Sequence, residues 1–122
     1  RREPSARVAV RLPSGEESVG AAVGDGPVDA IFAAIRDAIE VESELRSYSV
    51  SAVTEGADAL GEVTVTLRAH GRLASGQGVA TDILEASARA YVRALSNALD
   101  GAAVREAESV TAEAVSERTP GP

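Results

Sequence analysis

Residues 23–30 read VGDGPVDA, and this stretch turns an apolar strand into a helix through two glycines and a proline. Pro27 suits the first helical position, where a missing backbone N–H has no consequence. The unpaired N–H groups at a helix N-terminus, together with the positive end of the helix dipole, favour a carboxylate or a phosphate. The stretch is therefore either a tight turn without a ligand or a corner that binds an anion.

The arrangement around this corner occurs a second time in the chain. Residues 8–35 and 63–91 share the order of strand, glycine-containing turn, glycine-rich strand and helix. Neither unit could bury its apolar face alone, so the two are expected to pack together. The sequence predicts an α+β fold of two strand-strand-helix units related by a pseudo-twofold axis, with an extra linking strand at residues 45–53 and two small sheets each covered by a helix. The matching positions are Gly15 with Gly71, Gly20 with Gly76, Val23 with Val79, Asp29 with Glu85 and Ala30 with Ala86.

Residue periodicity locates the individual elements. The first helix begins at Pro27 and carries apolar residues at helical spacing as far as Ile39. The second helix is capped by Asp82, and Glu85 completes a pair that resembles a capping box. Alternation of apolar and polar residues predicts strands at residues 7–12, 18–23, 45–53, 62–69 and 72–80.

The two ends of the chain differ in composition from its middle. Residues 1–6 are expected to be an exposed linker, and the absence of an initial Met favours a piece of a longer protein. Residues 101–122 lack a continuous apolar stripe, which predicts a flexible or weakly helical tail. The folded domain is therefore expected at residues 7–100.

Composition narrows the classes of partner. The formal net charge is −7, all twelve basic residues are arginine, and aromatic residues make up 2% of the chain. A nucleic-acid partner is not expected, because phosphate binding needs a basic stripe and base stacking needs aromatic side chains. The lack of lysine fits either a high-salt cytoplasm or a GC-rich genome. With no cysteine and no apolar run long enough to cross a bilayer, the sequence predicts a cytoplasmic protein without a membrane partner.

Residues that carry catalysis are nearly missing. There is no cysteine and no lysine, and the single histidine, His70, stands in a turn with no carboxylate nearby in sequence to orient it. No spacing typical of metal ligands, of a serine nucleophile or of a phosphate loop occurs. We therefore expect no catalytic residue, no metal and no cofactor in this chain.

Small residues leave room for a bound guest. Residues 54–61 are rich in glycine and alanine, and such an excursion is either a plain connector or a loop that surrounds a ligand. A zwitterion suits the two glycine corners, because its carboxylate could take helix N-terminal donors while its ammonium meets backbone carbonyls or Asp25. The residues thus favour an amino-acid-binding module.

Four linked motifs carry a family resemblance. They are GDGPVDA at residues 24–30, YSVSAVT at 48–54, GADALGEV at 56–63 and GQGVATDILEAS at 76–87. In order and spacing, over residues 8–99, the chain resembles the C-terminal regulatory domain of 2-isopropylmalate synthases. The similar domain of citramalate synthases is the close competitor.

The resemblance implies a homodimer that binds the end-product amino acid near the subunit interface. This effector would be L-leucine, or L-isoleucine for a citramalate synthase. The parent enzyme would condense acetyl-CoA with a 2-oxo acid in a separate, metal-dependent catalytic barrel, so the divalent metal and acetyl-CoA would belong to that barrel. A dimerisation module with a vestigial pocket remains an alternative.

The resemblance also implies an effector set, which we define as the positions of this sequence that match the family's pocket. The role of Asp29 stays open, because some members have a small residue there. The effector set consists of Gly24, Gly26, Val28, Leu45, Tyr48, Ala52, Ala59 and Val79.

Overall fold

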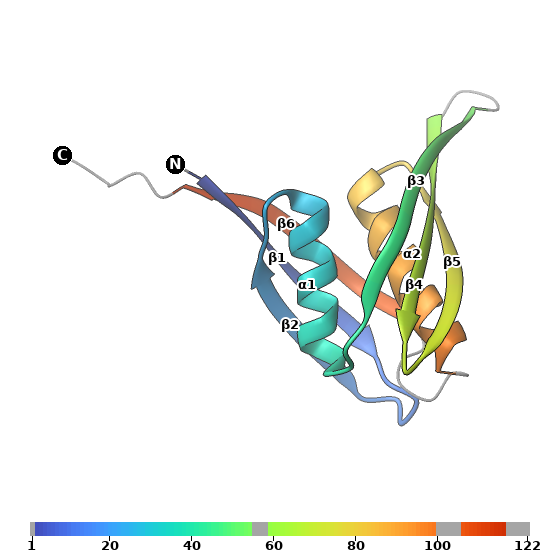
Figure 1. The fold of residues 1–122 in the computed structure, drawn as a ribbon. Coiled ribbons are helices and arrows are strands. Elements are labelled where there is room, and N and C mark those ends of the chain that lie inside the picture. The colour runs from blue at the N-terminus through green and yellow to red at the C-terminus, as the bar shows by residue number, and fades with distance from the viewer. Residues whose placement is uncertain (1, 55–58, 100–105, 117–122) are drawn as a thin grey trace.

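The computed structural model describes residues 2–54, 59–99 and 106–116 of the 122-residue chain. Figure 1 shows two helices that lie side by side between two small sheets. In chain order the elements are β1 (Arg2–Arg11), β2 (Glu17–Val23), α1 (Pro27–Ile39), β3 (Glu44–Thr54), β4 (Ala59–Ala69), β5 (Arg72–Ala80), α2 (Ile83–Ala98) and β6 (Glu106–Ser116).

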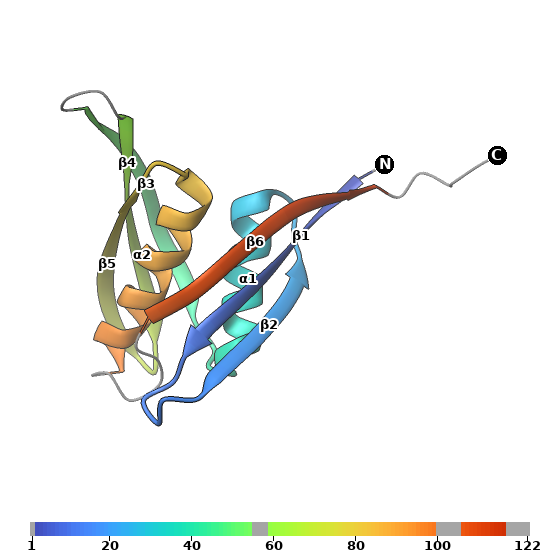
Figure 2. The same ribbon diagram turned by 180° about the vertical axis from the view of Figure 1, so that it is seen from behind.

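Both sheets are antiparallel and have three strands. The strand order is β2-β1-β6 in the first sheet and β3-β4-β5 in the second. Helix α1 packs against β1 and β2, α2 packs against β4 and β5, and the two helices contact each other. Figures 1 and 2, from opposite sides, agree on these layers. The predicted α+β class, with one helix on each small sheet, is confirmed.

The strand that follows each helix joins the sheet of the other unit. After α1 the chain enters β3, which pairs with β4, and after α2 it reaches β6, which pairs with β1. Strands β3 and β6 therefore occupy equivalent places beside the first strand of each repeat. The predicted linking strand is β3, and β6 is its counterpart.

Strand β6 corrects the predicted tail. We expected residues 101–122 to be flexible or weakly helical, but residues 106–116 form a strand paired with β1 from Arg2↔Ser116 to Arg11↔Glu106. The physical reason is that β1 would otherwise present a row of unpaired N–H and C=O groups, which an extended segment can satisfy. The remaining parts of the predicted tail, 101–105 and 117–122, lie outside the described residues.

The predicted linker at residues 1–6 is likewise corrected from residue 2 onward. Strand β1 begins at Arg2, Ser5 pairs with Val23, and Ala6 is buried. The backbone N–H of Gly24 also donates to the carbonyl of Pro4 at 3.1 Å. Strands on both sides fix this segment, and a prediction based on its Arg-Arg-Glu-Pro start could not detect either of them.

A tight turn joins β4 to β5, and a glycine in β5 lets α2 pack closely on that strand. His70 (φ 52°) and Gly71 (φ 76°) form the two-residue turn between the paired residues Ala69 and Arg72, which is the geometry of a type I′ hairpin. A Cβ on Gly76 would overlap the backbone of α2 at Ala94. Glycine in β5 therefore lets the helix rest directly on the strand.

The core lies between the helices and the inner faces of both sheets. Its largest fully buried side chains come from every layer, which explains why neither repeat is complete alone. They include Val8 and Val10 of β1, Ile31 and Ile35 of α1, Val63, Val65 and Leu67 of β4, and Tyr91 and Leu95 of α2.

Candidate functional site

The two glycine corners end in helix N-termini with different caps. The N-cap of α2 is Asp82, whose side chain accepts from the backbone N–H of Leu84 at 2.9 Å. The N-cap of α1 is Gly26, which has no side chain to accept such a bond. The first helical N–H to find a partner is that of Ala30, which donates to Gly26 at 2.9 Å. The second corner is therefore capped by its own carboxylate, whereas the first-turn N–H groups of α1 have no side-chain cap.

Asp29 has a clear structural role in the first corner. Its Oδ2 accepts the backbone N–H of Asp25 at 3.0 Å. A Cβ on Gly24 would lie 2.6 Å from the amide nitrogen of Ala30 and 2.7 Å from Asp29 Oδ2. Asp29 thus holds the turn closed from within, and Gly24 is needed because the turn packs tightly on itself.

Gly26 stands in a different environment from Gly24. A Cβ built on Gly26 would meet no atom within 4 Å. Packing within this chain therefore does not require glycine there. The missing side chain leaves open space directly beside the uncapped end of α1.

The inner face of β3 carries three residues of the effector set. A register shift between Leu45 and Ser47 places Leu45 on the same face as Tyr48 and Ala52. Tyr48 is half-buried, and its ring meets Phe32 edge-on at a centroid distance of 5.8 Å. Leu45 and Ala52 are exposed. This face is therefore anchored at its centre and uncovered at both ends.

Helix α1 contacts that face of β3 through Phe32. Val28 is packed against the core and stands one helical turn before Phe32, so both point to the same side of α1. Helix α1 and β3 run in opposite directions and diverge from the loop that joins them (Figure 1). The start of α1, with the open corner, therefore lies away from the far end of β3, and Phe32 is the residue of α1 that meets Tyr48.

The members of the effector set lie on separate surfaces of a single copy. Leu45 and Ala52 lie about 20 Å apart along β3 at about 3.3 Å per residue. Val79 is on the outer face of its sheet, because its neighbours Gly76 and Gly78 face α2. Ala59 pairs with Thr54 at the far end of the β3–β4 hairpin. One small ligand cannot touch all eight residues of the set within a single chain.

Sequence reasoning missed several residues that support Tyr48. The Tyr48 hydroxyl and the Ser87 Oγ are 2.9 Å apart, and Ser87 is completely buried. Phe32 stacks on Tyr91 at 4.4 Å, so the chain's three aromatic rings form one cluster between α1, α2 and β3. Val50, 47% exposed, lies between Tyr48 and Ala52 on the same face. The Tyr-x-Val-x-Ala alternation was the available signal for Val50, whereas no sequence spacing links Ser87 to Tyr48.

A second hydroxyl contact ties the aromatic cluster to α1. Arg36 donates through Nη1 to the Tyr91 hydroxyl at 3.1 Å, and Ser43 Oγ lies 2.5 Å from the same oxygen. Tyr91 therefore joins both helices to the segment that leads into β3. A displacement of Tyr48 would act on α1 through Phe32 and on α2 through Ser87.

Two features of the described residues bear on metal binding and on the single histidine. Within it, no three histidine or acidic side chains are placed to hold a metal ion. His70 is exposed in its hairpin turn. Neither described helix combines the length and the apolar character required to cross a membrane.

The architecture defines a small, internally duplicated α+β domain with an open helix corner and uncovered apolar strand faces. Residues 1–99 match the family model described as the LeuA allosteric (dimerisation) domain. The chain belongs to this family.

Relatives at about half identity have one name in common. The chain is 53% identical to a 2-isopropylmalate synthase of Picosynechococcus sp. over 76% of its length, and 52% identical to that of Crocosphaera subtropica over 81%. It is 50% identical to the 2-isopropylmalate synthase of Trichodesmium erythraeum over 78% of its length. The matched regions make up only 17% to 18% of these relatives. The chain therefore spans less than a fifth of each of these proteins.

Proposed function

We propose that this chain is the regulatory domain of a 2-isopropylmalate synthase and that it binds L-leucine for feedback inhibition. The parent reaction would be the condensation of acetyl-CoA with 2-oxoisovalerate in the cytoplasm, performed by a catalytic barrel elsewhere in the protein. Identity of about 50% to enzymes of that name supports the parent. The uncapped N-terminus of α1 is the observation that supports the ligand.

The chemistry of the open corner fits an aliphatic amino acid. A carboxylate would accept the N–H groups of Val28 and Asp29, which lie in the first turn of α1 and have no intrahelical partner. The carboxylate of Asp25 would attract the ammonium. The branched side chain would then lie against Val28, where about 25 cal/mol is gained for each Å² of apolar surface removed from water.

A second copy of the chain would complete the site. Several large apolar side chains are exposed on the described strands, and the effector set is not brought together within one copy. Isolated apolar side chains on a surface need no explanation, but exposed apolar residues along one strand face indicate an interaction site. The exposed large apolar residues are Val19, Val23, Leu45, Val50, Val53, Leu73 and Val79.

Inhibition would follow from linkage between binding and conformation. Leucine can inhibit only if it binds one arrangement of the domain and the barrel better than another, with a coupling free energy of about 1–3 kcal/mol. The aromatic cluster offers a route, because Tyr48 touches α1 through Phe32 and α2 through Ser87.

Isothermal titration calorimetry with leucine and isoleucine tests the proposal. We expect saturable leucine binding that Ala52→Leu weakens at least tenfold, because the added side chain would fill space on the inner face of β3 to which the effector set assigns the ligand. Ser51→Leu is the matched control, since the neighbouring residue points to the opposite face of β3. Tighter binding of isoleucine would indicate a citramalate synthase parent instead. No heat with either amino acid would contradict the proposal.

The alternative function is a dimerisation module whose pocket is vestigial. It is favoured by one observation: the effector set does not close into a single pocket within one chain. Analytical ultracentrifugation separates the two functions. A tight dimer whose dissociation constant does not change with leucine would support the alternative.

A further inference from the structure

A polar cleft of about 460 Å³ opens between α2 and β5, which is the edge strand of its sheet. None of its lining residues belongs to the effector set, and none is acidic. This volume is in the range of small-molecule sites, but its walls carry hydroxyl, amide and guanidinium groups instead of a mainly apolar surface. The cleft is lined by Thr64, Ser75, Gly76, Gln77, Arg93, Ser96 and Asn97.

Hydrogen bonds to the edge of β5 hold two of these side chains at the cleft. Arg93 donates through Nη1 to the carbonyl of Gln77 at 2.7 Å, and Asn97 donates through Nδ2 to the carbonyl of Ser75 at 2.7 Å. A guanidinium has five N–H donors, so most of those of Arg93 remain available. Within the described ranges Arg93 has no carboxylate partner, in contrast to Arg89, which pairs with Glu85 one turn earlier.

The first repeat shows that the fold does not require a cation here. In the repeat that matches Gly20 with Gly76, Asp37 of α1 stands where α2 has Arg93, and Ala21 stands where β5 has Gln77. Asp37 Oδ2 accepts the backbone N–H of Ala21 at 3.1 Å. A carboxylate and a guanidinium therefore each hydrogen-bond the equivalent strand edge, the first accepting from an N–H and the second donating to a carbonyl. The positive charge in the second repeat calls for a different explanation.

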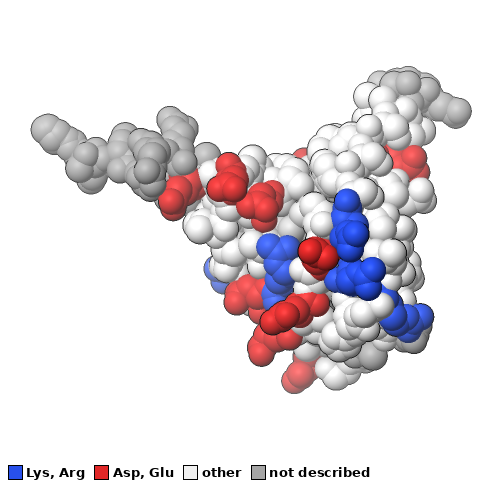
Figure 3. Space-filling model, viewed as in Figure 1, with Lys and Arg blue, Asp and Glu red and all other residues white. Residues whose placement is uncertain are grey.

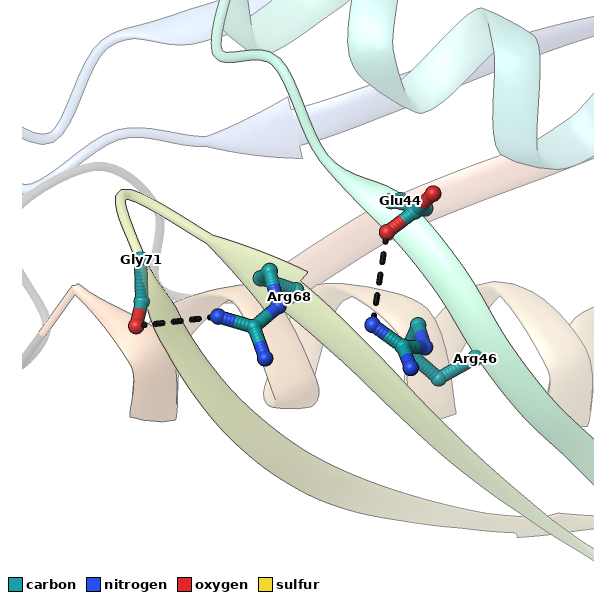
Figure 4. Close-up of polar contacts among 4 residues, drawn as sticks. All are labelled: Glu44, Arg46, Arg68 and Gly71. Atoms are coloured by element: carbon teal, nitrogen blue, oxygen red, sulfur yellow. Dashed lines mark hydrogen bonds and ion pairs between the residues drawn. The ribbon is translucent and has the colours of Figure 1, made fainter.

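The surrounding surface favours a negative ligand, although the whole chain carries a net charge of −7. Figure 3 shows basic side chains gathered over the half of the molecule that contains the β3-β4-β5 sheet. Figure 4 shows two of them, Arg46 beside Glu44 and Arg68, whose Nη1 donates to the carbonyl of Gly71 at 3.4 Å. On the outer face of β4, Thr64 lies between Glu62 and Arg68, so Arg93 itself is the positive charge at the cleft.

We propose that this cleft binds a small oxyanion, the carboxylate or phosphate group of a polar metabolite, at a site distinct from the leucine corner. The guanidinium of Arg93 would take two oxygens of the anion side by side. Hydroxyl groups of Thr64, Ser75 and Ser96 would donate to the remaining oxygens. The amide of Asn97 is already held by the strand edge and would fix the wall of the site.

Nuclear magnetic resonance titration of the 122-residue chain tests this proposal, with inorganic phosphate and malate as separate probes at constant ionic strength. We expect saturable shifts of the backbone amides at residues 75–77 and 96–97. Arg93→Gln should weaken the response at least tenfold, in line with the loss of a charge-assisted pair. Arg89→Gln removes the same charge from the same helix away from the cleft and should change the affinity less than twofold. The probe that saturates at the lower concentration identifies the carboxylate or the phosphate as the source.

Three results would overturn the oxyanion site. They are shifts that rise linearly without saturation, equal weakening by both arginine substitutions, or shifts confined to residues 26–30 at the start of α1. Circular dichroism of each variant verifies that it is folded. This test is separable from the test of the proposed function. Calorimetry with leucine measures binding at the α1 corner, and we expect Arg93→Gln to leave the leucine affinity unchanged.

Discussion

Gly26 and Asp82 are the N-cap residues of the two repeats, and only Asp82 has a side chain that caps its helix. The side chain of Asp82 accepts a hydrogen bond from the backbone N–H of Leu84, whereas Gly26 has no side chain that could accept one in α1. An N-cap side chain contributes about 1 kcal/mol to a helix relative to alanine, but only a few tenths of a kcal/mol relative to glycine. Its absence at one corner of a duplicated domain makes that corner less stable and more receptive to an anion.

Gly26→Ser should therefore stabilise the free domain and weaken leucine binding. The serine Oγ would accept the first-turn N–H that we assign to the ligand carboxylate, and no atom within 4 Å obstructs the new Cβ. We expect a gain of about 0.5 kcal/mol in the free energy of unfolding. Urea unfolding and calorimetry measure the two effects. A serine variant that binds leucine as tightly as the native chain would contradict the assignment.

The hydroxyl pair of Tyr48 and Ser87 gives a second prediction at this scale. Tyr48→Phe leaves the completely buried Ser87 hydroxyl without its partner at 2.9 Å. We expect the free energy of unfolding to fall by about 1–3 kcal/mol, because a buried polar group then loses its hydrogen bond. In the background of Ser87→Ala the same substitution should cost clearly less. Equal costs in both backgrounds, measured by urea unfolding, would show that the two hydroxyls are not coupled.

At the scale of elements, local sequence patterns predicted the helices and strands that depend on neighbouring residues. Helix periodicity placed α1 and α2, alternation placed β2 to β5, and the pairing of Gly20 with Gly76 anticipated the duplication. Local patterns also named the Gly24–Gly26 corner and the Tyr48-x-Val-x-Ala face as candidate site segments, and these stay predictions. The contact of Tyr48 with Ser87 joins residues far apart in the chain, so spacing alone could not give it.

Strand β6 is the clearest example of information that lies outside local pattern. Its pairing with β1 joins the two ends of the described chain and covers an edge of β1 that would otherwise be unpaired. The family model ends at residue 99, before β6 begins. The third strand of the first sheet thus comes from beyond the region that the chain shares with the family.

Truncation after Leu99 should therefore expose the edge of β1. We expect a lower unfolding midpoint and stronger self-association, because the unpaired N–H and C=O groups of β1 become a template for another chain. Sedimentation velocity and thermal unfolding of the shortened chain measure these effects. A truncated chain with unchanged midpoint and unchanged sedimentation would show that β6 contributes nothing to the stability of the first sheet.

At the scale of the whole molecule, the pseudo-twofold brings both glycine corners to the same end of the helix layer (Figure 1). The uncovered inner face of β3 and the open start of α1 lie at that end, and the family is described as an allosteric and dimerisation domain. If a second copy completes the effector site, ligand binding and dimerisation are thermodynamically linked equilibria. Their coupling must then be reciprocal.

Leucine should consequently tighten the dimer. If the two copies share the site, the factor by which dimerisation raises leucine affinity equals the factor by which leucine lowers the dimer dissociation constant. A coupling of about 1.4 kcal/mol would change that constant about tenfold. Sedimentation equilibrium over a dilution series, with and without saturating leucine, measures the shift. Ala52→Leu should abolish the shift, while Ser51→Leu on the opposite face should retain it. A dissociation constant that leucine leaves unchanged, in a chain that binds leucine by calorimetry, would place the effector site within one copy.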